Sequence, residues 1–225
     1  MFNKARLGLV AAVLLSALSS TASAGIIYTV SDGTNSYTVD PISTNQSGAA
    51  YYSLSSSSGH PAFDELENRG HFWLHENSAN GALSLGMMFD RETSASTGSG
   101  NINMTTSGFP TGASVTLSDD GGETTTLING TESFSWNGFN TDGAVIGGLE
   151  GLLWTIDITL NSFAGLGNGF VFVNGPGASG SFLSLALSAG DTLTISAAQM
   201  PVPEPAPLAL VALVFAGLAL RRRLA

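Results

Sequence analysis

Apolar and polar residues alternate in short runs through the middle of this chain, and this period of two limits its fold most. The clearest run is Leu153 to Leu160, in which Trp154, Ile156 and Ile158 fall on one side. Successive side chains of a β-strand point to opposite faces of the sheet, so such a run predicts a strand with one buried face. No helical period of apolar residues is sustained between residues 25 and 200. The alternation therefore predicts an all-β fold.

Similar short runs recur along the chain, with turns rich in Gly, Asn and Asp between them. Two stretches of small and polar residues, 93–108 and 137–151, predict long loops instead. The expected strands are 26–30, 36–39, 49–54, 82–89, 113–118, 123–128, 132–136, 153–160, 170–173, 182–187 and 192–196. This spacing is typical of a single antiparallel β-sandwich or jelly roll, formed here by residues 25–200.

The first 24 residues have the features of a secretory signal peptide. Lys4 and Arg6 precede the apolar stretch 7–18, and Ala22-Ser23-Ala24 follows it. A basic start, a short apolar segment and a small-x-small site are the three parts of such a peptide. We therefore expect export by the Sec machinery, with Ala22 and Ala24 forming the cleavage site and Gly25 beginning the mature chain.

The last residues, 201–225, hold three elements in a fixed order. Pro203-Glu204-Pro205 comes first, an apolar run follows at 206–220, and Arg221-Arg222-Arg223 ends it. Proline cannot continue a helix, and a block of arginines resists crossing a bilayer. At a rise of ~1.5 Å per residue the apolar run is roughly 22 Å long, short of the ~30 Å hydrocarbon core. The pattern predicts a single hydrophobic helix that holds the membrane only weakly.

This arrangement resembles the PEP-CTERM sorting signal, which combines Pro-Glu-Pro, a short hydrophobic helix and a terminal arginine cluster. The resemblance implies a substrate of exosortase, a membrane-embedded cysteine transpeptidase of Gram-negative bacteria that make exopolysaccharide. It further implies a body held in the periplasm by a transient inner-membrane anchor, cut near Pro203-Glu204-Pro205. The product would then reach the cell surface or the extracellular matrix. An ordinary C-terminal anchor that happens to contain Pro-Glu-Pro is the alternative.

The body between these two ends is strongly acidic and contains no cysteine. It holds all but Glu204 of the 17 acidic residues and only Arg69 and Arg91 of the seven basic ones, so its formal charge is −14. Such a surface repels nucleic acid phosphates, which excludes a nucleic-acid partner. Without cysteine, disulfides, thiol nucleophiles and thiolate metal sites are excluded as well.

All three histidines lie in one charged segment. His71 and His75 would share one face of a helix, and with Glu67 or Glu76 they could bind a transition metal. In a strand they would instead share a face with Trp73. The glutamate that zinc peptidases carry beside the first histidine is missing here. Since the two histidines and a carboxylate could still bind a metal, a metal-dependent hydrolase is the second alternative function.

Two acidic turns suggest a structural calcium ion, the one cofactor that we consider. Asp119, Asp120 and Glu123 lie in one turn and Asp142 in another, and carboxylates suit this ion. Neither turn matches the Asp-x-Asp-x-Asp-Gly loop. Asp is also a good turn former in the absence of any metal, so both explanations stay open.

Aromatic residues beside loops suggest contact with sugars. Trp136 borders a glycine-rich stretch, and Tyr51 and Tyr52 border a run of serines. If exposed, these rings would form a stacking platform, which makes a carbohydrate-binding module the first alternative function, with exopolysaccharide as its ligand.

No pattern marks a catalytic centre. The chain has no Gly-x-Ser-x-Gly elbow, and no acidic residue is distinguished by its neighbours. We therefore expect an exported, non-catalytic protein of the cell envelope or exopolysaccharide matrix, with a structural or adhesive role.

Overall fold

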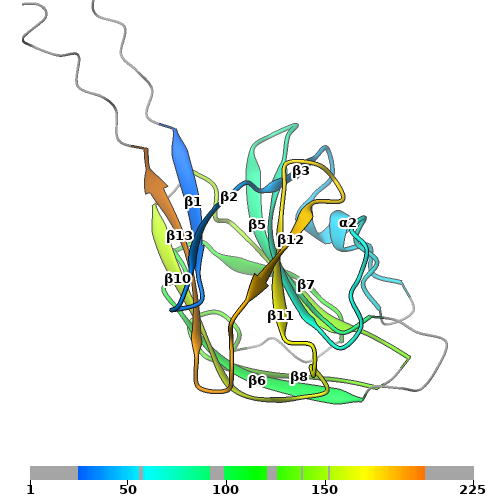
Figure 1. The fold of residues 1–225 in the computed structure, drawn as a ribbon. Helices are drawn as coiled ribbons and strands as arrows, with labels where there is room; N and C mark the ends of the chain where they lie inside the picture. The colour runs from blue at the N-terminus through cyan, green and yellow to red at the C-terminus, as the bar shows by residue number, and fades with distance from the viewer. Residues whose placement is uncertain are drawn as a thin grey trace, which may run out of the picture. The chain divides into compact units, whose positions relative to one another are not determined.

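Two β-sheets pack face to face in the computed structural model, which describes residues 25–55, 58–91, 99–120, 126–137, 139–151 and 153–200 (Figure 1). Residues Ile27–Ala198 form one unit with a shared core. The chain ends, Met1–Ile26 and Gln199–Ala225, are assigned to a second unit, of which residues 25–26 and 199–200 are described. The predicted all-β sandwich is confirmed.

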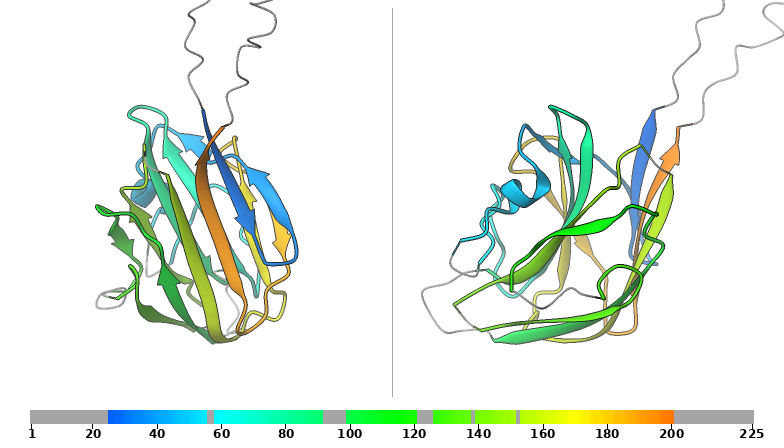
Figure 2. Two further views of the ribbon diagram at one scale, coloured as in Figure 1. Left: turned by 90° about the vertical axis from the view of Figure 1, so that its left-hand side faces the viewer. Right: turned by 180° about the vertical axis from the view of Figure 1, so that it is seen from behind.

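The first sheet has six strands in the order β2-β1-β13-β10-β6-β8. They are β1 (Ile26–Ser31), β2 (Ser36–Val39), β6 (Gly100–Ser107), β8 (Thr131–Trp136), β10 (Trp154–Ala164) and β13 (Thr192–Gln199). The first and last strands, β1 and β13, lie side by side in both views of Figure 2. The hydroxyl oxygens of Thr29 and Ser196 lie 2.6 Å apart across this pair. The strand nearest the tail is therefore an inner strand of the sheet.

The second sheet has seven strands and is mixed. They are β3 (Ile42–Thr44), β4 (Gly70–Asn77), β5 (Ala82–Phe89), β7 (Ser114–Ser118), β9 (Asp142–Gly147), β11 (Phe170–Asn174) and β12 (Ser181–Leu185). Their order is β12-β11-β4-β5-β9-β7, and β3 also pairs with β4. Strand β4 runs parallel to both β11 and β3, whereas the other strand pairs described in this sheet are antiparallel. The expectation of purely antiparallel pairing thus holds for most of this sheet but not for the pairs that β4 forms with β11 and β3.

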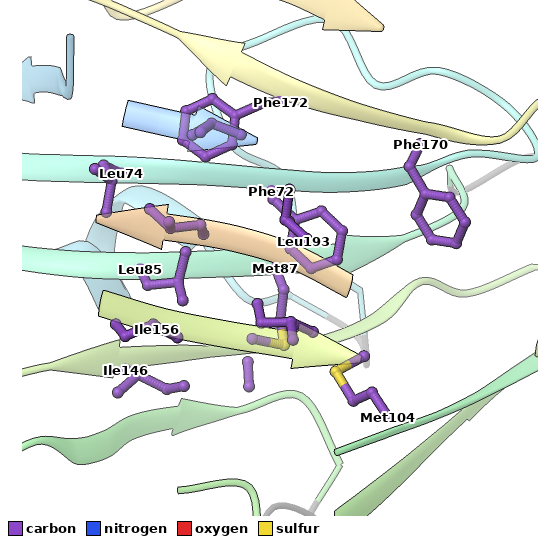
Figure 3. Packing of buried hydrophobic residues seen from close by; sticks show 14 of the residues in the cluster. Phe72, Leu74, Leu85, Met87, Met104, Ile146, Ile156, Phe170, Phe172 and Leu193 are labelled. Carbon is purple, nitrogen blue, oxygen red and sulfur yellow. The ribbon is translucent and has the colours of Figure 1, made fainter. Parts of the chain in front are cut away.

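The main core fills the space between the sheets (Figure 3). Phe72 and Leu74 enter it from β4, Leu85 from β5, Ile156 from β10 and Leu193 from β13, all with no exposed surface. These residues alternate with outward-facing ones, as the period of two predicts. Burial of each such side chain stabilises the fold by about 1.5–3 kcal/mol, which makes this layer the main source of stability.

Two segments predicted as loops contain strands. Within 93–108 the structure forms β6, and within 137–151 it forms β9, whose six residues are all buried. In β9 both faces are covered, so small and apolar residues such as Gly143 and Ala144 replace the expected alternation. The period-two signal is absent there because neither face meets water.

The segment 49–54, predicted as a strand, contains the short helix α2 (Gly48–Tyr52) instead. The hydroxyl oxygen of Ser47 accepts the N–H of Ala50 at 3.2 Å and caps the first turn. Tyr51 and Tyr52 from this helix are 2% and 0% exposed, so tertiary packing of the two rings overrides their preference for strands.

The turn between β1 and β2 is built on Asp32. Its Oδ1 accepts the N–H groups of Thr34 and Asn35 at 2.9 and 2.6 Å, which confirms the predicted hairpin. Its Oδ2 accepts the N–H of Ala186 at 2.8 Å, between β12 and β13. Burial alone would raise the pKa of Asp32, but these N–H donors outweigh it and the pKa is lowered. Asp32 therefore ties the first hairpin to the connection between the two sheets.

Candidate functional site on the outer face of the seven-stranded sheet

The face of the seven-stranded sheet that points away from the main core carries His71 and His75, and the candidate rings of Tyr51 and Tyr52 pack against it. Trp73 from β4, Met88 from β5 and Val145 from β9 form a second buried cluster on this face. Tyr52 and Phe63 cover them, with ring centroids 6.1 and 5.2 Å from that of Trp73. The chain between β3 and β4 therefore lies over the outer face and buries it.

The two histidines considered as metal ligands flank Trp73 on this face, as expected for a strand. Nε2 of His71 accepts the N–H of Leu66 at 3.0 Å. His75 stacks on Tyr51, with ring centroids 4.7 Å apart, and its Nε2 lies 2.8 Å from the hydroxyl oxygen of Thr44. Both side chains thus have structural partners.

Burial disfavours a charged imidazole at both positions. It lowers the pKa of His71 to about 4 and also lowers the pKa of His75. Four residues of strand place the two rings about 13 Å apart. Nowhere in the described ranges do three His, Asp or Glu side chains gather closely enough to hold a metal. The expectation that His71, His75 and a carboxylate converge is therefore wrong, because β4 is a strand and separates them.

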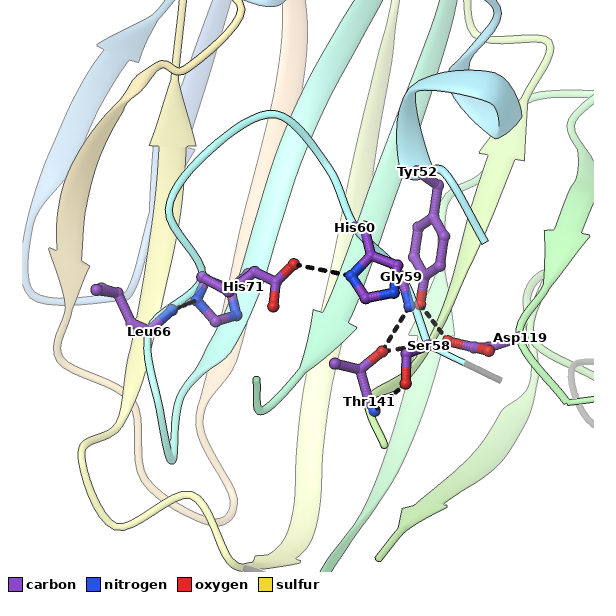
Figure 4. A network of polar contacts seen from close by, with 9 residues as sticks. Tyr52, Ser58, Gly59, His60, Leu66, His71, Asp119 and Thr141 are labelled. Atoms are coloured by element: carbon purple, nitrogen blue, oxygen red, sulfur yellow. Dashed lines mark hydrogen bonds and ion pairs between the residues drawn. The ribbon is translucent and has the colours of Figure 1, made fainter. Parts of the chain in front are cut away.

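A buried polar network lies beside the aromatic cluster (Figure 4). The hydroxyl of Tyr52 donates to Oδ2 of Asp119 at 2.7 Å, and the Thr141 hydroxyl donates to the same oxygen at 3.4 Å. The Thr141 hydroxyl oxygen accepts the N–H of Gly59 at 2.8 Å, and Ser58 accepts the N–H of Thr141 at 3.3 Å. The network joins α2 and the following residues Ser58 and Gly59 to the end of β7 and the start of β9.

Asp119 is the least satisfied member of this network. It is 8% exposed, and its Oδ1 has no hydrogen-bond partner among the described residues. Burial raises the pKa of Asp119, and the nearby charge of Asp120 adds to this, although the Tyr52 and Thr141 donors oppose it. The Asp119 carboxyl group therefore joins α2 to the residues before β9, although its burial disfavours the charged form.

The acidic residues proposed for calcium are brought together only in part. Asp119 and Asp142 approach each other because β7 pairs with β9, and the N–H of Asp119 donates to the carbonyl of Gly143 at 3.0 Å. Oδ2 of Asp142 accepts the N–H of Ser135 at 2.6 Å. Asp120 is exposed, and Glu123 lies outside the described residues. A calcium ion at this turn stays a prediction.

The aromatic residues proposed for sugar stacking are buried. Trp136 is 5% exposed, stacks on Phe89 at 5.9 Å between centroids, and donates from Nε1 to Oδ2 of Asp90 at 3.2 Å. Tyr51 stacks on His75 and Tyr52 stacks on Trp73, as described above. The expectation that these three rings are exposed is wrong, because the stretches beside them fold back as strand and helix and cover them.

An open pocket of about 240 Å³ lies farther along the same face, where no candidate was expected. Its floor consists of small residues on neighbouring strands, among them Ser84 of β5 and Gly147 of β9. Its walls include Asn77, Asn80 and Glu150. No local motif marks this pocket, since its residues come from α2, four strands and three connections.

The strand that leads to the tail is β13, which ends at Gln199. The expected sorting residues, Pro203-Glu204-Pro205 and Arg221-Arg222-Arg223, lie outside the described residues. The family profile described as the PEP-CTERM protein-sorting motif matches residues 201–223. The tail is a PEP-CTERM sorting motif. The resemblance drawn from these residues is confirmed.

A PEP-CTERM motif marks an exported protein that exosortase processes after transient anchoring in the membrane. The match covers the tail alone, and no curated protein and no solved structure matches the chain. Within the described parts of the chain, no helix is both long and apolar enough to cross a bilayer. The expected helix at 206–220 and the signal-peptide residues Ala22 and Ala24 lie outside those parts.

Proposed function

We propose that this chain is a non-catalytic protein of the cell envelope or exopolysaccharide matrix, with a structural or adhesive role. The observation that carries the proposal is the PEP-CTERM motif, which begins at Pro201, directly after the described sandwich. Residues 27–198 then form the folded domain that is exported and sorted through this motif.

The polar groups of the outer face support a structural role. His71 and His75 are fully buried, and the shifted pKa values described above keep both imidazoles neutral near pH 7. Tyr52 and Thr141 use their hydroxyls to hold Asp119. Groups that could act as acids, bases or nucleophiles are thus engaged in joining elements. A catalytic centre instead presents such groups to a substrate.

The charge of the body supports an extracellular setting. A formal charge of −14 favours solubility and repels anionic surfaces. Two basic side chains remain in the body, and one of them, Arg91, lies 3.7 Å from the carboxylate of Glu67. Such a body stays dispersed among neutral polymers and is attracted to cationic ones.

The sorting step is tested by replacing Pro203, Glu204 and Pro205 with alanine in the full chain. We expect an uncut form that is retained in the membrane, whereas the unaltered chain yields a shorter product. Mass spectrometry of both ends of the product locates the two cuts. A matched triple change of the exposed residues Thr34, Ser36 and Thr38 to alanine serves as the control and should leave the cut in place. Identical processing of the Pro-Glu-Pro variant would contradict the proposal.

A further inference from the structure

We propose that the pocket formed by Asn77, Asn80 and Glu150 binds a single neutral sugar residue of a glycan. This site differs from the aromatic one expected from the sequence, and it does not depend on how the protein is sorted. Its residues all belong to the unit Ile27–Ala198.

The pocket exists because the outward positions are small at this level of the sheet. Ser84 and Gly147 take the places that Trp73, Met88 and Val145 fill lower down on the same face. Gly48 and Ala49 at the start of α2 border the space without filling it. The resulting volume of about 240 Å³ falls below the ~300–1,000 Å³ of sites for drug-sized ligands, and suits one sugar ring.

The two asparagines present hydrogen-bond donors. Oδ1 of Asn77 accepts the N–H of Ala79 at 3.0 Å, and Oδ1 of Asn80 accepts the N–H of Ala82 at 3.0 Å. These bonds fix both side chains in the turn between β4 and β5. The Nδ2 groups are left without a partner among the described residues, and each can donate two hydrogen bonds.

Glu150 supplies a fixed acceptor opposite these donors. Its Oε2 accepts the N–H of Leu83 at 3.3 Å, which holds the carboxylate at the pocket. Its Oε1 has no partner in the described residues and can accept a hydrogen bond from a ligand hydroxyl. Ala49 and Ala82 add apolar surface suited to the C–H groups of a sugar ring.

The charge pattern selects against other small ligands. A carboxylate with no Lys or Arg among the lining residues disfavours phosphate and other anions. Amide N–H donors disfavour a metal ion, since the asparagine oxygens are already engaged in the turn. A neutral ligand bearing several hydroxyls matches both the donors and the acceptor.

The test uses the full chain and four soluble probes: methyl α-glucoside, methyl α-mannoside, methyl β-galactoside and N-acetylglucosamine. Saturation-transfer NMR and titration calorimetry measure binding to the unaltered protein and to Asn77→Asp, Asn80→Asp and Glu150→Gln. Each change keeps the oxygen that accepts the structural N–H and alters the group available to the ligand. We expect at least one probe to bind, and each variant to weaken that binding about fivefold or more.

The matched control is Asn137→Asp. Oδ1 of Asn137 also accepts a backbone N–H, that of Phe139 at 3.1 Å, on an exposed turn outside the pocket. It adds the same charge and should leave affinity within about twofold. The proposal is overturned if none of the probes binds, if the three pocket variants bind like the unaltered protein, or if Asn137→Asp weakens binding as much as they do.

Discussion

The hydroxyl of Tyr52 donates a 2.7 Å hydrogen bond to Oδ2 of Asp119, and so joins helix α2 to the end of strand β7. Both side chains are buried, and the bond spans 67 positions of sequence. It fastens the segment that covers the outer face to the sheet beneath it. Three further positions in the fold, Asp32, His71 and Gly86, have consequences for stability or protonation that can be measured.

Tyr52→Phe removes this donor without changing the ring. Oδ2 of Asp119 then keeps only the 3.4 Å bond from Thr141, so we expect a loss of about 1–3 kcal/mol in the free energy of unfolding. Urea denaturation measures the loss. Tyr37→Phe is the control, since Tyr37 is partly buried and its hydroxyl makes no described hydrogen bond. Equal stability of the two variants would mean that the Tyr52–Asp119 bond contributes nothing.

Asp32→Asn should destabilise the protein in a pH-dependent manner. One oxygen of Asn still accepts the turn N–H groups, but its amide nitrogen cannot accept the N–H of Ala186, so we expect a loss of about 1–3 kcal/mol at pH 7. The pKa of Asp32 is lowered in the fold, so its contribution is present above the unfolded value of 3.8 and is lost as pH falls through the lowered folded value.

The difference between the Asp32→Asn variant and the unaltered protein should therefore shrink as the pH falls below 3.8, which urea denaturation at several pH values follows. Asp191→Asn is the control, because Oδ2 of Asp191 accepts only the local N–H of Ser188 at 2.8 Å on an exposed turn. A difference for Asp32→Asn that grows on acidification would show that the assigned direction of the pKa shift is wrong.

The ring of His71 should stay neutral from about pH 5.5 to pH 8, because burial lowers its pKa to about 4. The proton should lie on Nδ1, since Nε2 accepts the N–H of Leu66. Nitrogen-detected NMR reports both properties. Because the unfolded chain takes up a proton on this ring more readily than the fold does, the free energy of unfolding should fall as the pH drops from 6.5 toward about 4. A titration of the His71 ring centred near 6.5 would show that this ring is not buried as described.

Gly86→Ala should destabilise the protein because a Cβ at this position would overlap the indole ring of Trp73. Trp73 is 1% exposed and enclosed by Tyr52 and Phe63, so the ring cannot move aside. Overpacking of this kind costs about 1–3 kcal/mol, measured as a lower midpoint of thermal unfolding. Gly167→Ala, where a Cβ meets open space, is the control and should change stability little.

Alternation of apolar and polar residues predicted β10, which has one exposed and one buried face, but β6 was missed although its burial alternates in the same way. In β10 the buried Trp154, Ile156 and Ile158 alternate with exposed or partly exposed residues. The predicted strand 153–160 begins one residue before β10 and ends four residues before its last residue. In β9 both faces are covered, so the alternation that marks a strand is absent. Helix α2 was missed because its tyrosines favour strands locally, and only contacts with Trp73 and His75 reveal why they lie in a helix.

The sorting motif can be predicted from the sequence alone, whereas the pocket cannot. Pro203-Glu204-Pro205 and the arginines are contiguous in the sequence, so the motif is recognised without any fold. The pocket joins Ser47 to Glu150 through strand pairings that no local pattern encodes. Likewise, the exposure expected for Trp136 depended on the neighbouring chain, which returns as β9.

The position of β13 between β1 and β10 sets when this fold can close. A polypeptide that crosses a membrane amino end first delivers β1 early and β13 last of all its strands. Until then the hairpin of β1 and β2 has no partner linking it to β10, and the six-stranded layer remains in two pieces. The six-stranded sheet therefore cannot be completed until β13 has crossed the membrane. Since the tail follows β13 directly in the sequence, completion of the sandwich and entry of the tail into the membrane should fall at nearly the same time.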